Sequence, residues 1–138
     1  MRAWKSILLA CVAALALAGC ASTGKQMSEL ERAQYTWSAA IRWGDFEGAW
    51  NMVDPAYRDA HPMSDLQFER YKQVQVSHYR ELASSPGESE ALREIEIGVI
   101  NRHTMAERTM RYTERWRYDA AKKAWWIDGG LPDFWAGE

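Results

Sequence analysis

The chain has 138 residues, of which 47% are hydrophobic and 26% charged, so it has room for one globular domain with a single core. Its formal net charge of −2 carries no basic excess, which excludes nucleic acid as an expected partner. Eight tryptophans are far more than ordinary usage and indicate large rings in a core or a pocket.

The first nineteen residues have the layout of a signal peptide. Arg2 and Lys5 precede an uncharged apolar run, residues 7–18, that is too short to cross a bilayer as a helix. The run ends in Leu17-Ala18-Gly19-Cys20, which resembles the lipobox of bacterial lipoproteins. The alternative is an ordinary secretory signal peptide that leaves Cys20 as a free thiol.

The lipobox resemblance implies a membrane anchor. The leader would be cleaved before Cys20, the thiol would receive a diacylglycerol, and the new amino terminus would be acylated, for example with palmitate. Ala21 and Ser22 follow the cysteine where an aspartate would retain a lipoprotein in the inner membrane. The resemblance therefore implies an outer-membrane lipoprotein that faces the periplasm.

This reading divides the chain into a signal peptide (residues 1–19), a lipidated tether (20–27) and a single domain (28–138). Cys11 lies in the leader, so the domain itself has no cysteine and no disulfide. Loss of Arg2 and Lys5 leaves 15 basic and 19 acidic residues, a net charge of −4. The membrane, reached through acylated Cys20, is then the first expected partner.

Helices are predicted for the first half of the domain. Ser28-Glu29-Leu30-Glu31 reads as a capping box that starts a helix. Gly44-Asp45 ends that helix and caps a second one, from Phe46 to about Val53, which Asp54-Pro55 ends in turn. Ser64 caps a third helix that runs to about Tyr71. The first helix has an apolar stripe made of Leu30, Ala33, Trp37, Ala40 and Ile41.

Strands are predicted for the second half, where the hydrophobic period changes from 3.6 to 2. They cover residues 73–82, 94–99, 110–118 and 125–127. Helices followed by an antiparallel meander predict an α+β fold, with N-terminal helices packed on a curled antiparallel sheet of about four strands.

Two stretches carry a resemblance to the nuclear-transport-factor-2-like superfamily, which has a cone-shaped, cystatin-like roll. They are AIRWGDFEGAWNMVDP (residues 40–55) and RWRYDAAKKAWWID (115–128). The superfamily includes ketosteroid isomerase, scytalone dehydratase and polyketide cyclases, which place Asp, His and Tyr in the mouth of the cone. The resemblance therefore implies the roll and admits an enzyme.

The candidate catalytic residues are Asp54, Tyr57 and His61. Asp54, like Asp45, already has a role as a helix cap. Tyr57 and His61 lie in a predicted loop that would rim the cone, where they could bind a ligand carbonyl or simply be solvated. His78 and His103 have no partner in the pattern, and the histidine spacing predicts no metal and no cofactor.

Aromatic side chains suggest a different kind of site. They could all form a core, or some could line an apolar pocket for a ligand or a hydrophobic peptide. The predicted ligand-binding residues are Trp50, Tyr57, His61, Tyr112 and Trp126.

Four arginines, Arg102, Arg111, Arg115 and Arg117, lie at or near the polar face of the predicted strands. If the hairpin turns about residues 105 and 106, Glu94 lies opposite Arg117 and Glu96 opposite Arg115. These pairs would neutralise the arginines. Without them, the arginines would form a patch for lipid phosphates or cell-wall carboxylates.

The functional prediction is a membrane-anchored periplasmic lipoprotein, non-catalytic, whose roll binds a partner protein of the envelope or an apolar small ligand. The alternative is a small isomerase, dehydratase or cyclase that uses Tyr57, His61 or Asp54 in a cone-shaped pocket.

Overall fold

A computed structural model describes the backbone of residues 2–136 and the side chains of Ile7 and residues 22–136. The side chain of Cys20, on which the lipidation prediction depends, lies outside this set. In order, the elements are α1 (Arg2–Trp43), α2 (Phe46–Trp50), α3 (Pro55–Ala60), α4 (Asp65–Tyr71), β1 (Val74–Ser85), β2 (Glu90–Asn101), β3 (Glu107–Asp119) and β4 (Ala124–Ile127).

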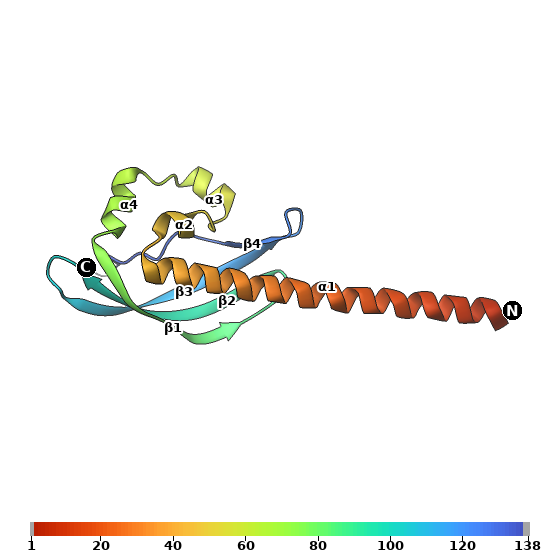
Figure 1. The fold of residues 1–138 in the computed structure, drawn as a ribbon. Coiled ribbons are helices and arrows are strands. Elements are labelled where there is room, and N and C mark those ends of the chain that lie inside the picture. The colour runs from red at the N-terminus through yellow and green to blue at the C-terminus, as the bar shows by residue number, and fades with distance from the viewer. Residues whose placement is uncertain (1, 137–138) are drawn as a thin grey trace.

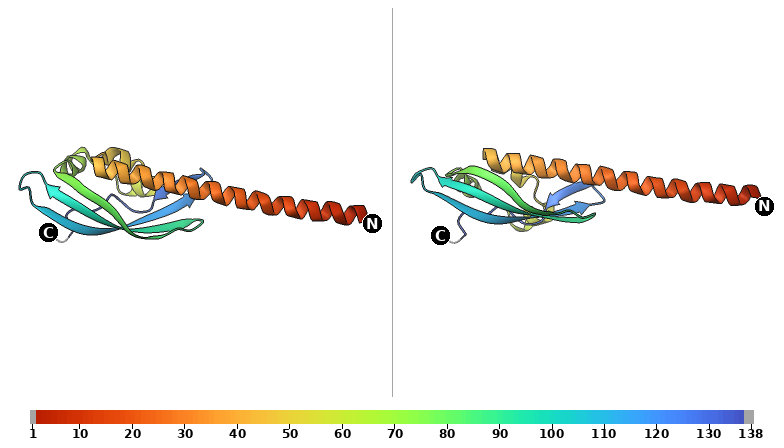
Figure 2. Two further views of the ribbon diagram at one scale, coloured as in Figure 1. Left: turned by 60° about the horizontal axis from the view of Figure 1, so that its bottom comes forward. Right: turned by 90° about the horizontal axis from the view of Figure 1, so that it is seen from below.

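The helices lie over one side of a curled antiparallel sheet with strand order β1-β2-β3-β4 (Figure 1). This is the α+β architecture that the sequence predicts. The C-terminal part of α1 crosses the sheet, and the N-terminal part extends well beyond it in all three views (Figures 1 and 2).

Helix α1 has the predicted apolar stripe but a different start. Leu30, Trp37 and Ile41 are buried against the sheet, as their spacing predicts. Ser28, predicted to cap the helix, instead lies inside α1, where its hydroxyl donates to the Gly24 carbonyl at 3.1 Å. The helix continues back through the predicted tether and leader because no residue there breaks it. The boundaries of leader and tether remain a prediction.

The described residues contain no helix with a stretch long and apolar enough to span a membrane.

The short helices begin where their caps predict. Gly44 adopts a φ of +76°, and the Asp45 carboxylate accepts from the Gly48 amide at 2.9 Å to start α2. Ser64 and Gln67 form the predicted capping box of α4. The predicted loop after Asp54 is wrong, because residues 55–60 form α3: Asp54 is its cap and Pro55 fits its first turn.

The predicted register of the β2–β3 hairpin is wrong by four residues. Glu90 lies opposite Arg117, Leu92 opposite Arg115, Glu94 opposite Thr113 and Glu96 opposite Arg111. The reason is a turn centred earlier than predicted. The Asn101 side chain accepts from the His103 and Thr104 amides, at 2.9 and 3.2 Å, and Met105 takes a φ of +59°.

The core lies between α1 and the sheet and is closed by the C-terminal segment. Trp37 of α1 meets Trp116 of β3 edge to face, with ring centroids 6.2 Å apart. Phe134, which follows the last strand, is fully buried and contacts Phe46, with the two ring centroids 5.8 Å apart. The segment after β4, for which the sequence pattern predicts no element, therefore completes the interior.

Candidate functional site

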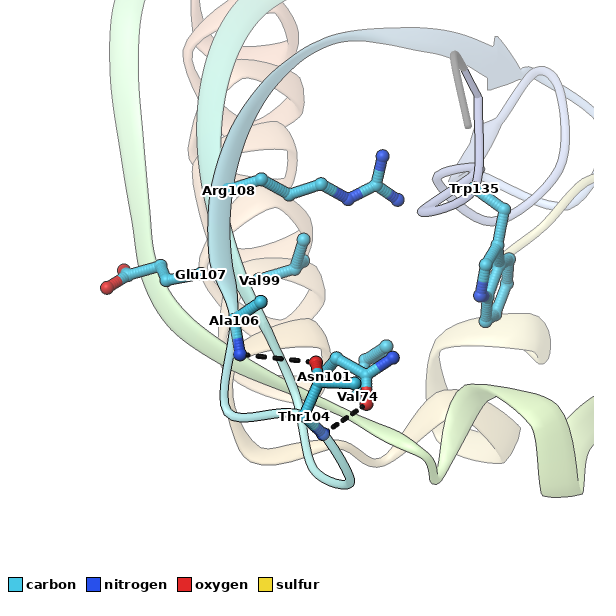
Figure 3. A pocket seen from close by; sticks show the side chains of 8 residues that line it. All are labelled: Val74, Val99, Asn101, Thr104, Ala106, Glu107, Arg108 and Trp135. Carbon is cyan, nitrogen blue, oxygen red and sulfur yellow. Dashed lines mark hydrogen bonds between the residues drawn. The ribbon is translucent and has the colours of Figure 1, made fainter.

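A small hollow opens at the end of the roll that carries the β2–β3 turn (Figure 3). Its volume is about 140 Å³. Val74 and Val99 form an apolar wall, and the guanidinium of Arg108 points across the hollow toward Trp135. The other lining residues are Asn101, Thr104, Ala106 and Glu107. We call this hollow the mouth.

Trp135 is held in the mouth by contacts from α4. The Arg70 guanidinium lies 4.0 Å from the Trp135 ring centroid, and the Tyr71 ring meets it edge to face at 4.9 Å. The Tyr71 hydroxyl donates to the Pro132 carbonyl at 3.0 Å, which fixes the segment that leads to Trp135. The ring is thus positioned before any ligand arrives.

The size of the mouth limits what it can take. Pockets for drug-sized ligands have volumes of about 300–1,000 Å³. A hollow of about 140 Å³ with one ring and two valines matches a single side chain or a similarly small molecule. A lipid tail or a sterol-like molecule would not fit without rearrangement of the β2–β3 turn or the C-terminal segment.

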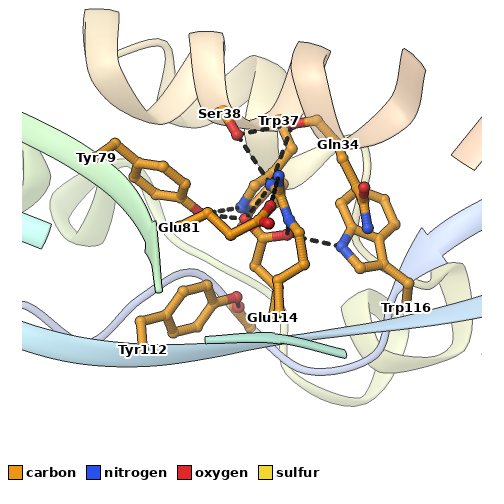
Figure 4. Close-up of polar contacts among 10 residues, drawn as sticks. Gln34, Trp37, Ser38, Tyr79, Glu81, Tyr112, Glu114 and Trp116 are labelled. Atoms are coloured by element: carbon orange, nitrogen blue, oxygen red, sulfur yellow. Dashed lines mark hydrogen bonds and ion pairs between the residues drawn. The ribbon is translucent and has the colours of Figure 1, made fainter. Parts of the chain in front are cut away.

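A buried polar cluster lies deeper, under α1 (Figure 4). Glu114 is fully buried on β3 and accepts from Arg93 Nε and Nη2, at 2.8 and 2.7 Å, and from Trp116 Nε1 at 2.8 Å. The Tyr79 hydroxyl also donates to Glu114, and Trp37 Nε1 donates to that hydroxyl at 3.0 Å. These five residues, from α1 and strands β1 to β3, form the Glu114 cluster.

Arg93 extends the cluster to the helix. Its Nη2 donates to the Ser38 hydroxyl at 3.0 Å, and its Nη1 lies 3.1 Å from a Glu81 carboxylate oxygen. Burial lowers the pKa of Arg93, but the hydrogen bonds and charge of Glu114 outweigh this and leave it above its ordinary value. Arg93 therefore keeps its positive charge in these surroundings.

Tyr79 shows the effect of the same surroundings on a neutral group. Burial, followed by the charge of Glu114 and the hydrogen bond to it, raises the pKa of Tyr79 far above the ordinary tyrosine value. With four donors bound and no exposed surface, Glu114 has no free oxygen to offer a substrate. The Glu114 cluster fastens α1 to the sheet instead of forming an open catalytic centre.

Glu114 was not among the candidates from the sequence, although a signal was present. In the alternation of β3, it falls on the same face as the apolar Tyr112 and Trp116. A carboxylate on a buried face needs a cation, and Arg93 interrupts the apolar face of β2 in the same way, between Ala91 and Ile95.

The structure brings three of the five predicted ligand-binding residues together. Tyr57 and His61, four apart on α3 and its C-cap, stack with centroids 4.3 Å apart, and Trp50 meets Tyr57 edge to face at 6.3 Å. The Tyr112 hydroxyl donates to the Gly130 carbonyl at 3.5 Å. Trp126 lies apart from them on β4, beside Arg117, with Lys122 Nζ 5.8 Å from its ring centroid.

The candidate catalytic residues do not form a dyad with one another. Asp54 caps α3 and accepts from Arg117 Nε and Nη2, at 2.9 and 2.6 Å. The His61 ring is exposed, and its Nδ1 lies 3.2 Å from the Tyr57 carbonyl oxygen. His78 Nε2 lies 3.5 Å from Glu96, and His103 lies exposed in the β2–β3 turn. Within the described part of the chain, no three His, Cys, Asp or Glu side chains gather as metal ligands would.

The observed register also changes the partners of the glutamates that were predicted to neutralise the arginine patch. Glu96 pairs with Arg80 at 2.6 Å, and Glu94 accepts from Thr113 at 2.8 Å, so neither forms its predicted pair. Arg117 is neutralised by Asp54. A hollow of about 340 Å³ beside Arg115 and Arg117 also has Glu90 and Asp128 in its lining, so its charge is mixed.

No protein-family model matches this sequence, and no curated protein matches it. Among solved structures, the chain is similar to a SEC-C motif containing protein from Rhodopseudomonas palustris, with 20% identity over 69% of this chain and 71% of that chain, at a TM-score of 0.55. A SEC-C motif containing protein from Psychrobacter arcticus has 13% identity over 75% of this chain and 60% of that chain, at a TM-score of 0.57.

A protein of the NTF2-like family from Streptomyces avermitilis has 11% identity over 76% of this chain and 93% of that chain, with a TM-score of 0.45. At these identities, the two SEC-C structures establish a shared fold and nothing about activity. The α+β roll is therefore found in other bacterial proteins, and the function of this chain has to be argued from its own residues.

Proposed function

We propose that this protein is a bacterial lipoprotein, anchored through acylated Cys20 to the outer membrane, whose non-catalytic roll binds a partner protein in the periplasm. The observation that carries the anchor is the Leu17-Ala18-Gly19-Cys20 sequence at the end of an apolar leader. The mouth is the proposed binding surface.

The first contacts between α1 and the rest of the domain lie close to Cys20, which supports a short spacer between the lipid anchor and the roll. Six residues after Cys20, the Gln26 carbonyl accepts from Trp125 Nε1 at 3.1 Å, and the Gln26 side chain donates to the Glu88 carbonyl. At a rise of 1.5 Å per residue, a helical spacer of this length covers about 9 Å. The roll would then sit against the membrane surface at the end that carries the β1–β2 and β3–β4 turns.

The direction of the mouth agrees with a partner in the periplasm. The β2–β3 turn, which lines the mouth, lies at the end of the roll opposite to the one from which α1 leaves (Figure 1). A roll anchored through α1 would point the mouth away from the lipid. A protein side chain fits the mouth better than a lipid tail does, because the mouth has a volume of only about 140 Å³.

A binding role is favoured over catalysis because the acids are already occupied. Glu114 is bound by four donors and Asp54 by Arg117 and the Ala56 amide. Tyr57 and His61 stack on each other at the surface and have no buried acid between them. An isomerase or dehydratase would need such a group held in a pocket that encloses the substrate, whereas His61 is exposed and does not line the mouth.

The anchor is tested by cell fractionation and mass spectrometry. Cys20→Ala should give an unacylated, uncleaved protein, because the thiol that carries the lipid is gone, and Cys11→Ala should be processed normally because it changes only the leader. A Cys20→Ala variant whose amino terminus is still cleaved between residues 19 and 20 and acylated would contradict the anchor.

The mouth is tested by methyl NMR spectroscopy with indole as a probe of side-chain size. Indole should shift the methyl signals of Val74 and Val99, and Trp135→Ala should abolish these shifts. Aromatic proton spectra recorded in parallel report on Tyr57 and His61, which have no methyl groups. Shifts confined to these two rings, together with turnover of a carbonyl substrate, would contradict the proposal and favour the enzyme.

A further inference from the structure

A second surface lies along β1, the strand at one edge of the sheet (Figure 2). β1 pairs with β2 on one side only. Among the described residues, Val74 to Val76 make no backbone hydrogen bond outside that pairing. An unpaired strand edge is a template for another extended chain, and natural proteins usually block it with bulges, charges or proline.

The blocking devices in β1 are confined to its later part. Register shifts interrupt the strand between Val76 and His78 and again between Glu81 and Ala83. Two neighbouring charged residues, Arg80 and Glu81, lie between these shifts. The first three residues, Val74-Gln75-Val76, have no bulge, charge or proline, so the beginning of β1 is the unprotected part of this edge.

A hollow of about 250 Å³ lies against this unprotected stretch. Trp43, at the end of α1, lines it and is 84% exposed. Arg42 and Arg102 line it from α1 and from the β2–β3 turn. The Arg102 backbone amide donates to the Gln73 carbonyl at 3.0 Å, which holds this arginine next to the start of the strand.

The charge of the hollow indicates its occupant. Within the described residues, the side chains of Arg42 and Arg102 make no hydrogen bond or ion pair, and the other lining residues are uncharged. A large exposed indole beside two unpaired guanidinium groups is a favourable surface for an apolar side chain flanked by carboxylates. A free strand edge supplies the backbone partners for an extended conformation.

We infer that the start of β1, with Trp43, Arg42 and Arg102, binds an extended acidic peptide segment of a partner protein by strand addition. The segment adds one strand beside Val74 to Val76, places an apolar side chain on Trp43 and directs carboxylates at the two arginines. This surface shares Val74 with the mouth but no other lining residue, and it does not depend on the lipid anchor.

The test uses the detergent-extracted full chain and a synthetic, blocked octapeptide, with binding measured by calorimetry. One face of the extended peptide alternates valine with glutamate and the other face carries threonine, because successive side chains of a strand point to opposite faces. Trp43→Ala and Arg102→Glu should each weaken binding about tenfold, since each removes a principal contact. Arg32→Glu is the matched control: Arg32 is an exposed arginine of α1 that lines a different hollow, and its change should have no comparable effect.

Backbone pairing is tested by methylating alternate peptide nitrogens. This removes N–H donors along one edge of the peptide and leaves its side chains unchanged, so binding should be lost. Replacing the glutamates with lysine should also abolish binding, whereas Trp135→Ala should leave it intact.

Three results would overturn the inference. The first is absence of binding at millimolar peptide, and the second is equal binding of the methylated peptide. The third is a concentration-dependent dimer, seen in analytical ultracentrifugation and lost on Trp43→Ala, which would make a second copy of this chain the occupant.

Discussion

At the scale of single residues, Glu114 is a buried carboxylate bound by four hydrogen-bond donors. It is fully buried, and its partners come from three strands and, through Trp37, from α1. A buried ion pair costs desolvation energy, so its net contribution to stability is small while it is intact. Removing one partner, however, leaves the other charge buried without compensation.

Glu114→Gln should therefore destabilise the protein by about 3–5 kcal/mol, because Arg93 would keep its charge with only Glu81 nearby. Chemical denaturation would measure this change. Arg80→Ala is the matched control, because Arg80 is exposed and its pair with the half-buried Glu96 should contribute less than about 1 kcal/mol.

The paired substitution Arg93→Met with Glu114→Met should recover much of the loss, since it removes both charges together. A Glu114→Gln variant no less stable than Arg80→Ala would contradict the role given to the Glu114 cluster.

At the scale of elements, α1 offers two tryptophans in opposite environments. Trp37 is fully buried and Trp43 is 84% exposed. Trp37→Ala should lower the free energy of unfolding by about 3–5 kcal/mol because it leaves a large cavity. Trp43→Ala should change it by no more than about 0.5 kcal/mol. Thermal and denaturant unfolding would test both, and equal losses would contradict the packing of α1.

The predictability of each element from sequence depends on how local its cause is. The stripe of α1 and the caps Asp45 and Ser64 are set by neighbours within four residues, and the sequence predicts them correctly. The β2–β3 register is set by how Asn101 folds the turn. A turn misplaced by two residues shifts every cross-strand pair by four, which is why the predicted glutamate–arginine pairs were wrong.

The candidate site was less accessible to sequence reasoning. Tyr57, His61 and Trp50 do gather, because α2 and α3 are close in the chain. The mouth depends on Trp135, which lies in a segment without periodicity and meets Val74 and Val99 only in the folded protein. No pattern within a window of the sequence relates these residues.

At the scale of the whole molecule, three half-buried tyrosines link stability to alkaline pH. Burial is the main cause that raises the pKa of Tyr71, Tyr79 and Tyr112 above the ordinary value near 10. A group whose pKa is raised by folding contributes its full stability below the unfolded pKa. That contribution is lost as pH rises above it.

The unfolding free energy should thus fall above pH 10, by about 1.4 kcal/mol per pH unit for each of these tyrosines. Denaturant titrations between pH 9 and 12, with tyrosinate absorbance as a second probe, would measure the slope. Tyr112→Phe should reduce the slope by the share of one tyrosine. An unchanged slope would mean that Tyr112 ionises in the folded state.

The hydrogen bond from Trp125 to the Gln26 carbonyl joins residues 99 positions apart, and it sets the order of events during synthesis. The chain grows from its amino terminus at about 5–20 residues per second. The strands and the C-terminal segment that cover the apolar stripe of α1 are therefore synthesised roughly 5–20 seconds after the stripe itself. Throughout this interval the apolar stripe of α1 is uncovered, and a chaperone can bind it.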